Sequence, residues 1–83
     1  MSRNIKAFDE FYSQEEVEGF MKDNGLSAGQ LAEVRRTIIG MLRDGDKGAT
    51  VFGVKFISEI DPEHDMTLIL DPYNAVVGTA FNN

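Results

Sequence analysis

The ionisable side chains of this sequence are densest between positions 59 and 65, where five of them fall within seven residues. Carboxylates beside an imidazole can bind a divalent metal or transfer protons in acid–base catalysis. The same residue types also make an ordinary solvated turn, and the proline among them favours a bend in the backbone. The residues concerned are Glu59, Asp61, Glu63, His64 and Asp65.

The available ligands argue against a metal centre at this position. Catalytic zinc sites typically include two or three histidines, whereas His64 is the only histidine here and cysteine is absent. The spaced acidic loop that binds calcium is also missing. In a continued strand, His64 would point away from Asp61, Glu63 and Asp65, so only a turn could bring them together. We therefore predict a solvated connection with no metal or cofactor, and keep a metal-dependent enzyme using His64 as a remote alternative.

Composition indicates a small globular domain and narrows the choice of partners. The 83 residues suffice for one domain, 1–83, and a 42% hydrophobic content exceeds that of disordered chains. A net charge of −6 disfavours direct nucleic-acid binding, which depends on lysine and arginine contacts to phosphate. The sequence shows no cysteine, no apolar leader and no membrane-spanning apolar run, so we expect a cytoplasmic protein without membrane contact.

Two helices are predicted in the first half. The segments 13–25 and 27–45 each begin with a serine followed three residues later by Glu or Gln, which is the capping-box pattern. Each segment ends at a glycine, the residue type that most readily terminates a helix. The short link between them predicts a helical hairpin. In the second segment, spacings of three and four predict a core-facing stripe of Leu31, Val34, Ile38, Ile39, Met41 and Leu42.

The second half changes to the alternating pattern of β-strands. Residues 49–60, 66–70 and 75–81 are each predicted to form one strand. Between the last two, the sequence DPYN at 71–74 matches a type I turn followed by a left-handed residue, which closes a tight hairpin. We predict an α+β fold in which the N-terminal helical hairpin packs on a three-stranded antiparallel meander. Residues 3–12 are interpreted as either a short helix or an irregular arm.

The final hairpin, LILDPYNAVVGTAF at 68–81, resembles the last hairpin of small ribonuclease toxins of the barnase/RelE-like group, which also place helices before a sheet. The resemblance covers about a sixth of the chain. It implies a ribonuclease-like activity in which His64 and Thr79 would be the residues of interest. Those proteins tend to be basic, with several His, Arg or Lys at the site, whereas this chain is acidic.

The predicted sheet carries more apolar side chains than two helices can cover. The side expected to face the helices consists of Phe52, Val54, Phe56, Met66, Leu68 and Leu70. The opposite side is expected to consist of Val51, Ile57, Ile69 and one of Val76 or Val77. Monomers rarely leave such a patch uncovered, so either the N-terminal arm or another chain is expected to cover it.

These features predict a small acidic protein that binds another protein and is not an enzyme. We expect a homodimer, because open strand edges and apolar sheet faces favour pairing across a two-fold axis. The size and style are those of accessory or inhibitory factors of phages and mobile elements, whose acidic residues can mimic nucleic-acid charge. The alternative is a structural subunit of a larger, viral-type assembly. The predicted partner-binding residues are Glu15, Glu16, Glu18, Val51, Ile57, Ile69, Asp61, Glu63, His64 and Asp65.

Overall fold

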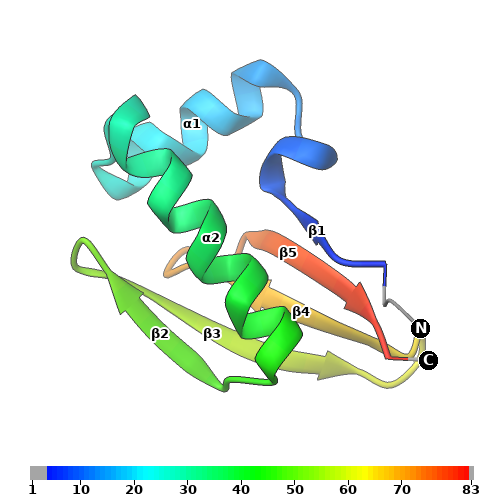
Figure 1. The fold of residues 1–83 in the computed structure, drawn as a ribbon. Helices are drawn as coiled ribbons and strands as arrows, with labels where there is room; N and C mark the ends of the chain where they lie inside the picture. The colour runs from blue at the N-terminus through cyan, green and yellow to red at the C-terminus, as the bar shows by residue number, and fades with distance from the viewer. Residues whose placement is uncertain (1–3, 83) are drawn as a thin grey trace.

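The structure, a computed structural model, describes residues 4–82 and shows two helices packed on one antiparallel sheet (Figure 1). The α+β prediction is therefore confirmed, but the sheet has five strands where three were predicted, in the order β1-β5-β4-β3-β2. In chain order the elements are β1 Lys6–Ala7, the 3-10 helix η1 Phe8–Glu10, α1 Gln14–Asn24, α2 Ala28–Asp44, β2 Gly48–Val51, β3 Val54–Asp61, β4 Met66–Leu70 and β5 Val76–Phe81.

Both helices begin and end where the capping signals predict. The Ser13 hydroxyl accepts the Glu16 N–H at the start of α1, and Ser27 accepts the Gln30 N–H at the start of α2, each at 3.2 Å. The side chains of Glu16 and Gln30 return the bond to the backbone N–H of the capping serine, so both boxes are complete. Each helix ends at a left-handed glycine.

The first additional strand arises because residues 49–60 form a hairpin and not one strand. Phe52 and Gly53 occupy the two-residue turn between β2 and β3, with φ of 51° and 76°. Positive φ at both positions is the type I′ geometry, for which Asn-Gly and Asp-Gly are the usual sequences. Phenylalanine continues the apolar alternation through the turn, so the pattern hides the break. Phe52 is consequently 48% exposed, and the prediction that it faces the helices is wrong.

The second additional strand comes from the N-terminal segment. Lys6 pairs with Thr79 and Ala7 with Gly78, which makes β1 an edge strand beside β5. The chain then turns through η1 and buries Phe8 completely within the core. The predicted short helix corresponds to η1, whereas β1 before it extends the sheet at its edge. The described part of this segment does not cover the second sheet face.

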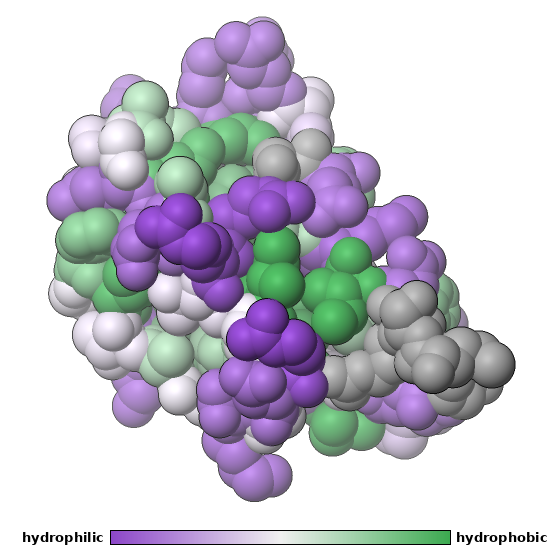
Figure 2. Space-filling view, viewed as in Figure 1, coloured by the Kyte–Doolittle hydropathy of each residue, from purple (hydrophilic) through white to green (hydrophobic). Residues whose placement is uncertain are grey.

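The hydrophobic core lies between α2 and the sheet. The predicted stripe is confirmed: Val34, Ile38, Met41 and Leu42 are buried, while Leu31 and Ile39 pack beside them. Phe20 connects the layers, since its ring centroid lies 5.1 Å from that of Phe8 and 6.3 Å from that of Phe56. Figure 2 looks onto this helical side, where hydrophilic residues dominate and hydrophobic residues reach the surface only in small areas.

Gly78 in β5 lies in close contact with α2. A methyl group at Gly78 would lie 2.5 Å from Cγ2 of Ile38 and 3.2 Å from Cδ1 of Leu42. A glycine inside a strand often marks such a contact with another element. At Gly40 in α2, by contrast, a methyl group would meet only an arginine side chain at 3.9 Å.

We predict that Gly78→Ala lowers the free energy of unfolding by about 1–3 kcal/mol, because the added methyl overpacks the α2–sheet contact. The matched control is Gly19→Ala in α1, where an added methyl has no atom within 4 Å. That change should raise stability by about 0.5–1 kcal/mol, since alanine favours the helix. Urea unfolding followed by circular dichroism measures both. An unchanged stability for Gly78→Ala would contradict the tight contact.

Candidate functional site

The stretch with the dense ionisable residues forms the connection between β3 and β4, as the sequence predicts. Asp61 pairs with Met66 at the ends of the two strands, and the four residues 62–65 make the turn. Asp65 adopts a left-handed φ of 52°, and its carbonyl accepts the backbone N–H of Asn82 at 3.0 Å. This second contact ties the turn to the end of β5.

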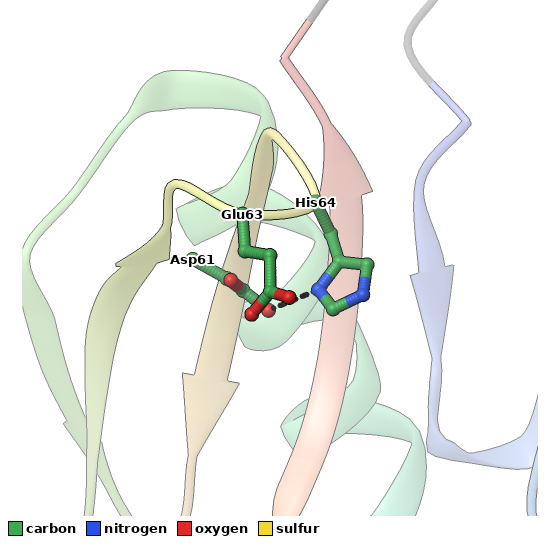
Figure 3. A group of neighbouring side chains, drawn as sticks. All are labelled: Asp61, Glu63 and His64. Atoms are coloured by element: carbon green, nitrogen blue, oxygen red, sulfur yellow. Dashed lines mark hydrogen bonds and ion pairs between the residues drawn. The ribbon is translucent and has the colours of Figure 1, made fainter.

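Three side chains of this turn gather at one point. The ligand-type atoms of Asp61, Glu63 and His64 all lie within 4.8 Å of one another. Figure 3 shows them on the same side of the sheet, so the turn brings the histidine to the acids, which a straight strand would not. The group is open to solvent, with 63% of the His64 side chain exposed. Exposed acidic groups of this kind are common without a bound ion.

The electrostatics of this turn depend on one contact. Nδ1 of His64 lies 2.9 Å from Oδ2 of Asp61, and the hydrogen bond from His64 is the main reason that the pKa of Asp61 falls below its ordinary value of 3.8. A lowered folded-state pKa means that the ionised Asp61 carboxylate adds stability above pH 3.8, and that this stability is lost as pH falls through the lowered value. Both groups face water, so the contribution is small.

The predicted acidic residues of α1 lie elsewhere on the molecule. Glu16 accepts the Ser13 N–H at 2.8 Å as part of the cap, and Glu18 accepts a side-chain N–H of Gln14 at 3.4 Å. Glu15 is exposed in the same turn of helix. Figure 1 places α1 at the opposite end of the molecule from the β3–β4 turn, so the two acidic groups do not form one surface.

Of the apolar residues predicted for the uncovered sheet face, Ile57 lies there, and so does Val76 of the pair Val76 and Val77. Ile69 is completely buried and packs in the core, and Val51 packs against the core from β2. Their predicted placement is therefore wrong. Both faces of β4 are apolar, so alternation could not tell which one meets the helices. The signal that could have done so is Gly78, because the register places Ile69 directly opposite it.

We call the side of the sheet opposite α2 the open face. In Figure 3 this side faces the viewer and α2 lies behind the strands. Register assigns its residues: Ile57 pairs with Leu70, Leu70 with Val76, and Met66 with Phe81. Leu70 is 8% exposed yet lies outside the core cluster, which agrees with this placement. The apolar residues of the open face are Ile57, Met66, Leu68, Leu70, Val76 and Phe81.

Comparison of the chain with protein-family models, curated proteins and solved structures gives no match. Neither of the α-helices among residues 4–82 is long and apolar enough to cross a membrane. Two surface features described above bear on the function: the acidic turn and the open face.

We predict that His64→Ala raises the pKa of Asp61 toward 3.8, because its principal hydrogen bond is removed. A carboxyl-carbon NMR titration of the labelled protein measures the change directly. The control in the same turn is Glu63→Gln, which keeps the backbone N–H and the histidine and should leave the lowered pKa in place. If the pKa of Asp61 were the same in the parent and in His64→Ala, the contact would be of no electrostatic consequence.

Proposed function

We propose that this chain is a non-enzymatic protein-binding module that forms a homodimer through its open face. The observation that carries the proposal is the group of apolar side chains from β3, β4 and β5 on a sheet face that no described helix covers. Ile57 is 37% and Phe81 40% exposed, at opposite ends of this surface. Burying apolar area of this kind is the main favourable contribution to protein association.

The distribution of the apolar residues over three strands supports a partner of protein size. Adjacent strands supply neighbouring apolar residues, with Ile57 beside Leu70 and Met66 beside Phe81 in the register. Another sheet can pack on a sheet face of this kind at a spacing of about 10 Å. A small ligand, by contrast, needs a concave site with converging polar groups.

The charges of the open face support a second copy as the partner. Lys55 lies at one end of the open face of β3, and the acidic residues Glu59 and Asp61 lie on the same face toward its other end. Glu63 and Asp65 follow Asp61 in the turn. An antiparallel two-fold arrangement of two such faces places Lys55 of each copy toward the acidic turn of the other. A two-fold interface of this type is self-complementary, and it is the commonest arrangement among homo-oligomers.

The other interpretations stay predictions. A subunit of a larger, viral-type assembly would bury the same face permanently, and it would differ from a dimer in the mass of the assembled particle. Mimicry of nucleic-acid charge would use the acids of α1 and of the β3–β4 turn, which lie at opposite ends of the molecule. An enzyme built on His64 would have only Asp61 and Glu63 beside it in the described cluster.

We predict that the parent chain is a dimer in solution and that Ile57→Glu weakens the dimer about tenfold or more, because it places an unpaired charge within the apolar interface. Analytical ultracentrifugation over a range of protein concentrations measures the dissociation constant. Circular dichroism establishes that the variant is folded.

The matched control is Ile60→Glu, a substitution of the same kind on the opposite face of β3. Ile60 is 64% exposed, so a charge there should leave both folding and dimerisation unchanged. A parent chain that stays monomeric at high concentration would overturn the homodimer. Equal weakening by the two substitutions would show that the interface is not the open face.

A further inference from the structure

A pocket of about 260 Å³ lies between α1 and the turn that joins β4 to β5. Roughly 300–1,000 Å³ is usual for sites that hold drug-sized ligands and cofactors, so this pocket suits a single side chain. Its walls combine aromatic rings with carboxylates, and no lysine, arginine or histidine lines it. The residues on which the argument rests are Tyr12, Glu16, Phe20, Asp23, Asp71 and Tyr73.

Asp71 in this pocket is a buried carboxylate held only by neutral donors. Only 4% of the residue is exposed, and no ion pair between described residues includes it. Oδ1 accepts the backbone N–H groups of Tyr73 and Ala75, each at 2.9 Å. Oδ2 accepts one long bond of 3.3 Å from the side chain of Asn24. Buried charges in proteins are normally paired with a charge of opposite sign, and this one is not.

The geometry around Asp71 is fixed before any ligand arrives. Asn74 closes the turn by donating its N–H to the Asp71 carbonyl at 3.0 Å. Asn24 at the end of α1 bonds both Asp71 and the Phe20 carbonyl, which ties the helix to the turn. From the other side, the Tyr12 hydroxyl donates to the Val76 carbonyl. A site that is held in place in this way loses little entropy on binding.

The pocket is also a region of negative potential. The pKa of the Tyr12 phenol is raised above its ordinary value, first by burial and then by the negative charges of Asp71 and Glu16. These negative charges oppose ionisation of the Tyr12 phenol, and for the same reason they favour a bound cation. Tyr73 is 65% exposed at the mouth, where its ring can lie against an entering group.

We propose that this pocket binds the cationic side chain of an arginine or lysine presented by a partner protein. The buried carboxylate of Asp71 would pair with the positive charge of that side chain, and Glu16 and Asp23 line the same pocket. The aromatic rings of Tyr12 and Tyr73 add cation–π contact with the guanidinium or ammonium group. Arginine has the further advantage of a planar group that stacks on aromatic rings and donates several hydrogen bonds.

The inference does not rest on the proposed dimer, because the pocket lies at α1 and not on the open face. The probes are N-acetylarginine amide and N-acetyllysine amide, added to the ¹⁵N-labelled chain and followed by amide chemical shifts. We expect saturable shifts centred on Gly19, Tyr73 and Ala75, with a dissociation constant in the millimolar range that suits one side chain. The dimer variant Ile57→Glu should bind the probes equally, so the two proposals succeed or fail separately.

Charge and space are tested independently. N-acetylcitrulline amide has nearly the shape of the arginine probe without its charge and should give no saturable shifts. Gly19→Leu extends a side chain from a position with free space beside the pocket and should abolish binding. Asp23→Asn should weaken binding about two- to fivefold, the worth of one partly exposed charge pair. The control Glu15→Gln, outside the pocket on the same helix, should change nothing.

Three results would overturn the proposal. Equal binding of the citrulline and arginine probes would show that charge is not recognised. Unchanged binding to Gly19→Leu would show that the probes bind elsewhere, and an absence of saturable shifts at tens of millimolar would show that the pocket has no such ligand. If the lysine probe binds and the arginine probe does not, stacking of a planar group is excluded and the ammonium is the ligand.

Discussion

The contact between α2 and β5 at Gly78 determines how the layers of this protein fit together. Because Gly78 has no side chain, Ile38 and Leu42 rest directly on the strand, and α2 can lie across the sheet. The helix thereby reaches strands on both sides of β5 and buries its whole apolar stripe on one sheet face. Ala7 and Ala80, both fully buried, keep the neighbouring positions equally small.

That arrangement leaves the second sheet face without a helix. Both α-helices lie on one side of the sheet. The described part of the N-terminal segment forms an edge strand and contributes Phe8 to the core. The apolar residues of β4 illustrate the result, because Ile69 is fully buried under α2 while its neighbour Leu68 stays partly exposed on the open face. Two helices on one side of a five-stranded antiparallel sheet leave the other face either to solvent or to a partner, and the proposed dimer would bury it.

The sequence predicts those elements whose signals are local. Ser13 and Ser27 mark the helix starts because a cap needs only a few neighbouring residues, and Asn74 adopts the left-handed conformation expected of it, with φ of 64°. The break between β2 and β3 was missed because Phe52 keeps the strand alternation while sitting in a left-handed turn conformation. The sequence did not reveal which side of β4 faces the helices, because that depends on how β4 pairs with β5 and not on the residues of β4 alone.

The sequence could not predict the pocket at Asp71 either. In the sequence, the aspartate is fully explained by the turn, and Oδ1 does bind two backbone N–H groups there. Only the docking of α1 buries the remaining oxygen, because Asn24 and Phe20 come from a helix that lies 47 residues or more away in the chain. Burial makes the charge strong by lowering the local dielectric constant. The same residue thus closes the hairpin and supplies a localised negative charge, whereas the open face offers apolar area. Under the two proposals, the open face would contribute affinity and the pocket would select a partner by charge.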